Sequence, residues 1–332
     1  MDLAPTPEQE LLLATASDFV ARSVDSQAVR RLEAGEPGHD RAHWATMAEL
    51  GWTELGPVEL ALVADRLGQA ALPSPVVVTG ALRGALPDLA AQLAPDAVLT
   101  LAALTPGSPH EWADSAIPGG DTLTGTFVLV PFAASAEVAV VATTTGLAAF
   151  DPSAPGVALT RHDAIGGDPL YRLDCTAVPV RPVAGNLGTA LDHLAVSGLA
   201  YAVGAAEGAL ALAVQHAKDR HQFGRPIGAF QAVAHRCADM RAEVDACRAL
   251  VHRAAWALDR GDNREVAVAS ALAYANDALR RVAMHAHQVH GAIGFSTEHD
   301  LHLFTRRIKA YELTYGSTAR HQERLATAIG LK

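Results

Sequence analysis

Long apolar stretches dominate the last part of the chain. From about Leu187 to Ala217 the sequence is rich in Ala, Leu and Val, contains no Pro and has only scattered Gly. A run of this length is typical of a helix rather than of a buried strand. Breaks follow at 224–228, 261–263 and 291–296, so residues 187–332 are predicted to form a bundle of four or five helices.

Short apolar runs between clusters of Gly, Pro, Asp and Thr characterise residues 96–186. Four of these runs predict strands, at 98–104 (VLTLAAL), 121–133 (DTLTGTFVLVPFA), 138–150 and 170–180. The pattern predicts a small β barrel or sandwich between two helical regions.

Residues 1–95 carry the pattern of short helices. One is predicted from Thr6 to Val24, where the sequence TPEQE places Pro in the first turn, and another from Val58 to Gly68. The chain is therefore predicted to be a multidomain α+β protein, with a helical domain at 1–95, a β domain at 96–186 and a helical bundle at 187–332.

Composition narrows the class of protein. The chain has 332 residues, half of them hydrophobic, which is enough for a large core. Its formal charge of -10 argues against a nucleic-acid partner. No apolar run is expected to span a membrane, and the N-terminus does not resemble a secretory signal. Three widely spaced cysteines, Cys175, Cys237 and Cys247, favour a reduced, cytoplasmic protein.

The segment RHQFGRPIGAF, Arg220 to Phe230, is the most informative one. It ends one long helix and begins the next, with Gly224 and Pro226 at the break. The guanidinium group of Arg220 suits a diphosphate, and Phe223 offers an apolar ring beside it. The alternative is an Arg that caps a helix next to a Phe that fills the core.

This segment resembles the R-x-x-F-G-x-x-(I/L)-x-x-x-Q signature of the acyl-CoA dehydrogenase family. A second family-like run, QVHGAIGF, follows at Gln288 to Phe295. The resemblance implies the fold of that family and an FAD-dependent desaturation of an acyl-CoA thioester. In the family both motifs reach across a dimer interface to the FAD of the neighbouring subunit. The residues to which the resemblance assigns this contact are Arg220, Gln222, Phe223, Gln288, Gly291 and Ala292.

Three features depart from the family pattern. Two adjacent glycines are replaced by Gly291 and Ala292, and the added methyl group restricts the approach of the backbone. The aromatic-Ile-Thr/Ser tract that lies along the isoalloxazine ring is replaced by LVPFA at Leu129 to Ala133. The N-terminal region lacks the Gly-rich loop of the family, so part of the acyl cavity is expected to be missing or rebuilt.

The catalytic base of the family is also absent from both of its usual positions. Desaturation requires a carboxylate that removes the α proton while the flavin N5 accepts the β hydride. Most members use the Glu of a Y-E-G-T sequence, where this chain has Gly316. A minority place the Glu on the long helix before the first motif, at the position of Leu194.

Two other carboxylates lie close to these positions in the sequence. Glu312, one helical turn before Gly316, is a weak candidate base, and its alternative role is an i, i+3 ion pair with Lys309. Asp192 lies near Leu194, where a carboxylate early in a helix is favoured by the helix dipole. A displacement of one turn moves a carboxylate by about 5.4 Å, which proton abstraction does not tolerate without rebuilding.

Polar residues near the second motif and the last helix could serve other chemistry. Ser317 or Thr318 is predicted to cap the last helix, and in the family this Thr faces the diphosphate of the flavin. The histidines near the second motif provide no i, i+4 pair, so no metal site is predicted and surface or interface roles are preferred. These histidines are His285, His287, His290, His299 and His302.

The combination of both flavin motifs with a missing base resembles one kind of family member in particular. This is the shorter β-type subunit of actinobacterial two-gene acyl-CoA dehydrogenases that act on CoA thioesters of sterol side chains. In those α2β2 heterotetramers the longer subunit supplies the Glu, and FAD lies at the interface. The resemblance implies a longer homologue as partner, and an electron-transfer flavoprotein or similar acceptor. A self-sufficient homo-oligomer with a displaced base or a carrier-bound acyl substrate, and a flavin-free scaffold, are the alternatives.

Overall fold

The computed structural model describes residues 4–107 and 117–331 of the chain. Contacts within the protein divide it into two compact units. Unit one consists of Met1–Ser26, Ala61–Leu72 and Gly198–Lys332, and unit two of Gln27–Leu60 and Pro73–Ser197. The domain boundaries predicted after residues 95 and 186 lie where helices give way to strands and strands to helices, and they differ from the boundaries of these units. They stay a prediction.

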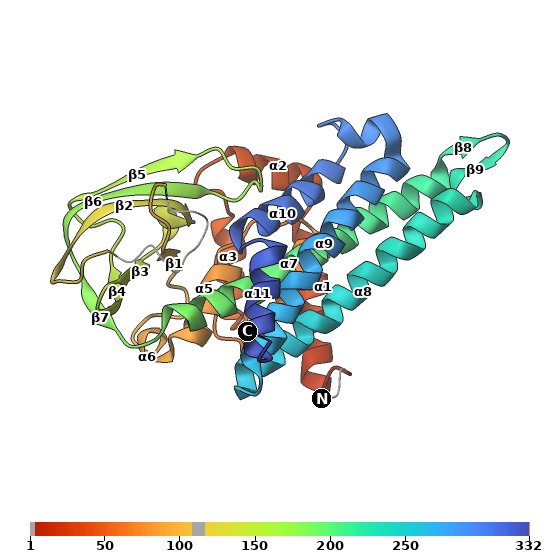
Figure 1. Ribbon diagram of the computed structural model, residues 1–332. Coiled ribbons are helices and arrows are strands. Elements are labelled where there is room, and N and C mark those ends of the chain that lie inside the picture. The colour runs from red at the N-terminus through yellow and green to blue at the C-terminus, as the bar shows by residue number, and fades with distance from the viewer. Residues whose placement is uncertain (1–3, 108–116, 332) are drawn as a thin grey trace. The chain divides into compact units, whose positions relative to one another are not determined.

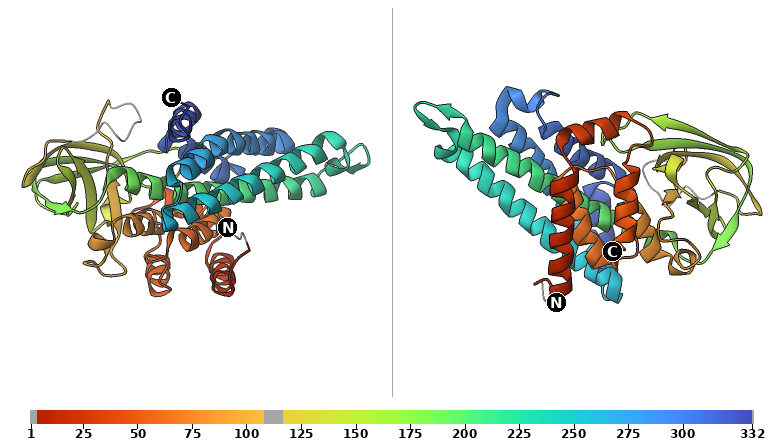
Figure 2. Two further views of the ribbon diagram at one scale, coloured as in Figure 1. Left: turned by 60° about the horizontal axis from the view of Figure 1, so that its bottom comes forward. Right: turned by 180° about the vertical axis from the view of Figure 1, so that it is seen from behind.

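Unit one is helical. Its helices are α1 (Pro7–Ser23), the second half of α4 (Pro57–Gln69), most of α7 (Leu187–Asp219), α8 (Gln231–Arg260), α9 (Arg264–His290), α10 (Leu301–Thr314) and α11 (Thr318–Ala328). Figures 1 and 2 show α7 and α8 as long antiparallel neighbours joined by a hairpin of two short strands, β8 (His221–Gln222) and β9 (Arg225–Pro226). The predicted bundle of four or five helices after residue 187 is therefore confirmed, with five among the residues described.

Helix ends in unit one occur where the sequence predicts them. α1 begins after Thr6, whose side-chain oxygen accepts a hydrogen bond from the backbone N–H of Gln9, and Pro7 occupies the first helical position. Gly261 and Gly291 follow α8 and α9 with φ angles of 78° and 66°. Only glycine adopts such angles without strain, so these residues end the helices.

Helices α4 and α7 approach so closely that their backbones touch at glycines. A Cβ atom added to Gly204 would lie 1.9 Å from the carbonyl oxygen of Asp65, and one added to Gly68 would lie 2.0 Å from that of Tyr201. Neither position has space for a methyl group. The Ala- and Gly-rich composition of α7 is thus a packing requirement as well as a source of helix propensity.

Unit two combines short helices and two β sheets. Its helices are α2 (Ser26–Ala34), α3 (Arg41–Glu49), the first half of α4, α5 (Val76–Ala85) and α6 (Pro87–Ala90), and α7 begins in this unit. One sheet has the order β1-β3-β4-β7, with strands at Leu99–Ala102, Val138–Thr143, Gly146–Phe150 and Arg181–Val183. The other has the order β2-β6-β5, with strands at Thr122–Pro131, Leu170–Pro179 and Val157–His162.

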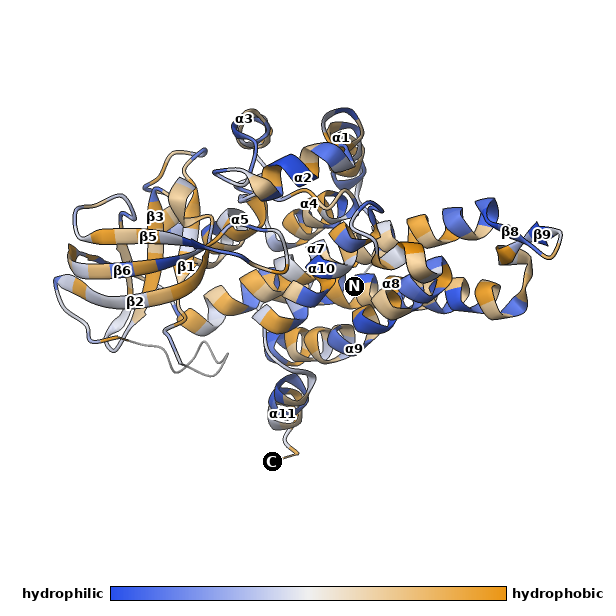
Figure 3. Cartoon of the chain, turned by 90° about the horizontal axis from the view of Figure 1, so that it is seen from above, coloured by the Kyte–Doolittle hydropathy of each residue, from blue (hydrophilic) through white to orange (hydrophobic). Residues whose placement is uncertain are grey.

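A shared apolar core joins the two sheets. Phe127 and Leu173 from the second sheet and Val141 and Phe150 from the first belong to one cluster of buried residues. Figure 3 shows β2 and β3 coloured mainly as hydrophobic. The α+β fold class is confirmed, and the middle segment forms the sandwich-like arrangement that the sequence predicted.

Two strands of unit two were not predicted. β5 lies at an edge of its sheet and its side chains are exposed or only half-buried, so it lacks the apolar alternation that marks a strand. β7 has three residues, too few for a pattern.

The expectation that no apolar run could span a membrane is wrong for α7. By length and composition this helix qualifies, with a mean hydropathy of 1.4 over its most apolar window. In the described structure, however, 78% of that window is buried inside the fold. Such burial is typical of the core helix of a soluble protein.

The close crossing of α4 and α7 leads to a test of stability. Replacing Gly204 by Ala should lower the free energy of unfolding by roughly 1–3 kcal/mol, because the methyl group forces the two backbones apart. Chemical denaturation of the purified chain measures this difference. Gly125→Ala is the control, because its Cβ atom would meet the nearest atom at an ordinary 3.7 Å. Equal stability of both variants would show that the crossing is not tight.

Candidate functional site

The hairpin after α7 holds the backbone of the first motif firmly. The N–H of Arg220 donates to the carbonyl oxygen of His216 at 2.9 Å, and the N–H of Ile227 donates to that of Arg220 at 2.8 Å. Gln222 pairs with Arg225 in the hairpin. The side chains of Arg220 and Gln222 are exposed. Their backbones are therefore fixed while the side chains remain available for a ligand or a partner.

Phe223 stands at the tip of this hairpin with its ring in solvent. Its side chain is 91% exposed, and its φ angle of 53° places it in the left-handed region together with Gly224. Behind it, Phe230 makes an edge-to-face contact at 6.1 Å and in turn carries the guanidinium of Arg225 at 4.1 Å. The alternative in which Phe223 fills the core is excluded.

The second motif forms a tight turn at the end of α9. Gln288 is exposed in the last turn of this helix, and Gly291 and Ala292 are exposed in the short 3-10 helix η4 (Gly291–Phe295). Gly294 is packed closely, since a Cβ atom there would lie 2.9 Å from that of His290. The turn therefore presents its outer residues on a rigid base.

Two histidines bring the motifs to the same end of the helical bundle. The ring of His216, in the last turn of α7, stacks on the ring of His290, the last residue of α9, with centroids 4.8 Å apart. Arg220 and Gly291 follow these two residues closely in the sequence. Two motifs that are far apart in the sequence thus lie on one end of unit one.

These histidines pack against one another at this end of unit one. His290 is buried, and burial lowers its pKa, which keeps its ring neutral. His299 contacts it edge to face at 4.7 Å. Among the described residues no group of three or more His, Cys, Asp or Glu side chains is arranged to hold a metal ion.

Thr318 lies apart from the other predicted flavin contacts. Ser317 caps α11 by accepting a hydrogen bond from the N–H of Arg320 at 3.3 Å, and Thr318 is the first helical residue. Nearby, the side chain of Asn276 on α9 donates a hydrogen bond to the carbonyl oxygen of Gly316. Asn276 lies about twelve residues before Gln288, which is roughly 18 Å along the helix. The structure therefore separates Thr318 from the end that carries both motifs.

Gly316 occupies a backbone conformation that disfavours the acid of the family pattern. Its φ angle is 102°, where an L side chain is strained. A Cβ atom would also lie 3.3 Å from Nε2 of His321. The amide of Asn276 donates to the carbonyl oxygen of Gly316 at 2.9 Å, which holds this turn in place.

His321 fills the space beside Gly316 as a neutral ring. Its side chain is 4% exposed, and neither ring nitrogen has a hydrogen-bond partner of good geometry in the described part of the chain. Burial lowers the pKa of His321 to about 4, although the backbone of Tyr315 opposes the shift. An uncharged imidazole thus lies next to the position that a Cβ atom of residue 316 would take.

The other two carboxylates near the base positions are Glu312, which forms an ion pair, and Asp192, which is buried. Glu312 accepts a hydrogen bond from Nζ of Lys309 at 3.0 Å, so the predicted i, i+3 ion pair is confirmed. Leu194 and Asp192 are both buried on α7.

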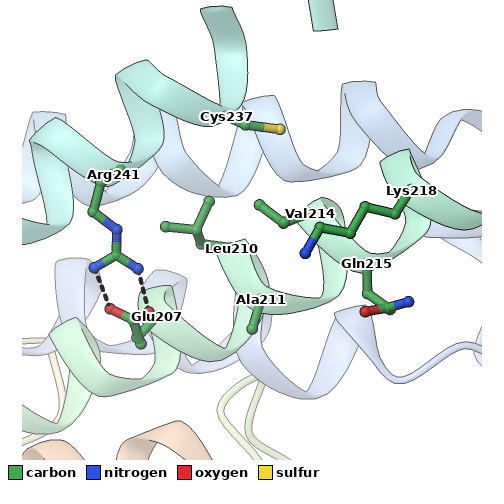
Figure 4. A pocket seen from close by; sticks show the side chains of 8 residues that line it. All are labelled: Glu207, Leu210, Ala211, Val214, Gln215, Lys218, Cys237 and Arg241. Carbon is green, nitrogen blue, oxygen red and sulfur yellow. Dashed lines mark hydrogen bonds and ion pairs between the residues drawn. The ribbon is translucent and has the colours of Figure 1, made fainter. Parts of the chain in front are cut away.

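A cleft of about 360 Å³ opens between α7 and α8. Figure 4 shows its lining, in which Arg241 and Glu207 face one another at one end and Lys218 projects over the other. Burial would raise the pKa of Glu207, but hydrogen bonds from Arg241 and Arg248 outweigh it and leave that pKa lowered. The carboxylate is therefore held charged in an ion-pair network rather than poised to remove a proton.

Comparisons with known proteins find acyl-CoA dehydrogenases, the family whose motifs the chain carries. Residues 186–330 match the profile of the acyl-CoA dehydrogenase C-terminal domain. The acyl-CoA dehydrogenase IpdE2 of Mycobacterium tuberculosis is 31% identical over 327 residues, which cover 92% of each chain. The ChsE4-ChsE5 complex of M. tuberculosis contains a chain with a TM-score of 0.86 and 26% identity over the full length of both chains. A steroid ACAD variant gives a TM-score of 0.87 and 26% identity over 98% of each chain.

The buried imidazole beside Gly316 makes stability dependent on pH. His321 has a pKa of about 4 in the folded chain against 6.5 ordinarily, so the unfolded chain binds a proton that the folded chain does not. Stability should therefore be full above pH 6.5 and fall as the pH drops toward 4, by on the order of 3 kcal/mol from this residue.

Urea unfolding of the chain across this pH range measures the effect. His321→Phe removes this titrating group and should reduce the pH dependence, whereas the same change at the exposed His235 should not. An unchanged slope in the His321 variant would contradict this assignment.

Proposed function

The chain belongs to the acyl-CoA dehydrogenase family, whose members are oxidoreductases acting on CH–CH groups, and on this premise we propose that it is a base-lacking subunit. Its role is to complete an FAD site that is held mainly by a longer homologous subunit. That partner supplies the Glu that removes the α proton during α,β-desaturation of an acyl-CoA thioester. This chain supplies trans contacts to the cofactor and is inactive alone.

The geometry at Gly316 carries this proposal. Its backbone angle disfavours any side chain, and the hydrogen bond from Asn276 and the nearby ring of His321 hold the turn in a form that suits glycine at the main base position. The minor base position holds the apolar side chain of Leu194. An oxidoreductase of this family without a base needs another chain to remove the proton.

The tract that should lie along a flavin ring in this chain supports the same division of roles. Pro131 has no backbone N–H to offer to a ring. Phe132 is buried with a φ angle of 52°, and the ring of His39 contacts it edge to face at 5.9 Å. The ring of Phe132 therefore packs within the protein rather than against a cofactor.

The segment that contains His39 is tied firmly to the sheet. Arg161 on β5 forms an ion pair with Glu36 at 3.1 Å and donates to the carbonyl oxygen of Gly35 at 2.5 Å. The hydroxyl of Tyr171 on β6 donates to the same Glu36 at 2.5 Å. The cover over Phe132 is therefore part of the fold, which argues that the flavin ring is held by the partner.

The exposed residues of the two motifs fit a dinucleotide. FAD, when bound, would accept the hydride from the substrate. Arg220 would pair with the diphosphate, and the ring of Phe223 would lie against a flat or apolar part of the cofactor. The amide of Gln288 and the backbone at Gly291 and Ala292 would contribute hydrogen bonds from the second motif, and Thr318 at the start of α11 is a further proposed contact.

Partner and substrate are proposed from the similar proteins. The ChsE4-ChsE5 structure is a complex of two different chains, which supports a hetero-oligomer, with an α2β2 arrangement as the proposed form. The similarity to a steroid ACAD supports a sterol-derived CoA thioester as substrate. An electron-transfer flavoprotein or similar acceptor would reoxidise the cofactor.

Co-expression tests the proposal directly. The chain purified alone should contain little flavin and show no dehydrogenase activity, and co-expression with a longer homologue should restore both. In the complex, Arg220→Ala should weaken FAD binding roughly 10- to 100-fold, because a charge-assisted contact to the diphosphate is lost.

Flavin absorbance and titration of the depleted complex with FAD measure both effects. Arg22→Ala, at a side chain that is 80% exposed on α1, is the matched control. Full activity of the single chain would refute the subunit role, and a flavin-free complex would favour a scaffold instead.

The proposal also predicts that Glu312 is dispensable for catalysis. Glu312→Gln should leave turnover of the complex within about twofold, because Glu312 is held in a partly exposed ion pair with Lys309, and such pairs contribute little. Steady-state kinetics of the complex measure this. Loss of turnover with retained flavin would support a self-sufficient enzyme with a displaced base.

A further inference from the structure

We propose that Phe295, held face to face on His287, is a further contact of this chain with FAD and stacks on one of the planar rings of the dinucleotide. This inference rests on the proposed function. It adds an aromatic platform to a motif whose assigned contacts are otherwise an amide side chain and backbone groups.

The two rings form a preassembled stack with one open face. The centroids of His287 and Phe295 are 4.6 Å apart and their planes differ by 20°. Phe295 is nevertheless 75% exposed. The imidazole covers one face of the phenyl ring, so the opposite face is the one available to a ligand.

The lower ring of the stack is fixed by the neighbouring helix. Nε2 of His287 lies 3.2 Å from the hydroxyl of Thr305 on α10, and that hydroxyl donates to the carbonyl oxygen of Leu301 at 3.4 Å. His287 is therefore the donor in its own hydrogen bond to Thr305. Burial lowers the pKa of His287, so the ring is neutral and free to stack.

The turn that carries Phe295 is equally constrained. A Cβ atom on Gly294 would lie 2.9 Å from His290 and 3.3 Å from Leu301, so this part of η4 is packed against α9 and α10. A ring held in advance loses little conformational entropy when a ligand binds. The ring of Phe295 is thus held in advance in a position where a ligand could stack on it.

Its place in the motif points to the cofactor. Phe295 ends the short helix that begins at Gly291, which puts it roughly 8 Å along that helix. His287 directly precedes Gln288 in the sequence. A phenyl ring has no polar group, so it recognises a planar ring by stacking and not the diphosphate or the ribitol chain.

FAD binding by the co-expressed complex tests this inference. Phe295→Ala should weaken FAD binding roughly 5- to 150-fold, the range found when aromatic side chains that stack on bases are removed. Phe295→Trp keeps a flat ring and should bind FAD within about threefold of the original protein. Leu11→Ala is the control, because Leu11 is an apolar side chain of similar exposure, 69%, on α1.

FMN, which lacks adenine, identifies the ring. If adenine is stacked, Phe295→Ala weakens FAD binding and leaves FMN binding unchanged. If the isoalloxazine is stacked, binding of both weakens and the flavin absorption spectrum shifts. Either pattern supports the platform.

Two outcomes overturn the inference in different ways. If the original complex binds FAD and Phe295→Ala binds it equally well, the platform is refuted while the proposed function stands. The platform is likewise refuted if the variant loses only its association with the partner, which would make Phe295 a protein contact. If the original complex binds no FAD, both proposals fail.

Discussion

The stack of His216 on His290 is the contact on which the candidate site depends. It joins the last turn of α7 to the last turn of α9. Each of these helices is followed directly by one of the two motifs. Long helices are stiff, so fixing their ends relative to one another also fixes the hairpin and η4 that follow. Burial lowers the pKa of both histidines, and neutral rings stack without the repulsion that two charged rings would suffer.

Much of this arrangement could be predicted from the sequence because it depends on local patterns. The apolar run before Arg220 predicted α7, glycines predicted where α8 and α9 end, and the spacing of Lys309 and Glu312 predicted their ion pair. These features arise within a few residues. The edge strand β5 escaped prediction because its exposed side chains lack a periodic pattern. The apolar run of α7 is itself ambiguous, since a buried core helix and a membrane span have the same composition.

The contacts that define the site could not be predicted, because they join residues far apart in the sequence. No local pattern places the ring of His321 beside Gly316, or the amide of Asn276 on its carbonyl group. Phe295 stands inside the run QVHGAIGF, yet its importance depends on the ring of His287 beneath it and on its exposure, which only the fold reveals. Sequence patterns therefore identified the motifs, and tertiary packing decides which of their side chains are available.

The proposed subunit role is consistent with a contrast between buried and exposed positions in the chain. At Gly316 the backbone angle disfavours a side chain and the ring of His321 lies close by, and at Phe132 the ring is buried against His39. At Phe223 and Phe295, by contrast, large rings are held in fixed positions in water. Large apolar rings that stand exposed in water are unfavourable unless another surface covers them. The proposed subunit role accounts for both conditions, because a chain that completes a neighbour's site needs exposed contacts and no base of its own.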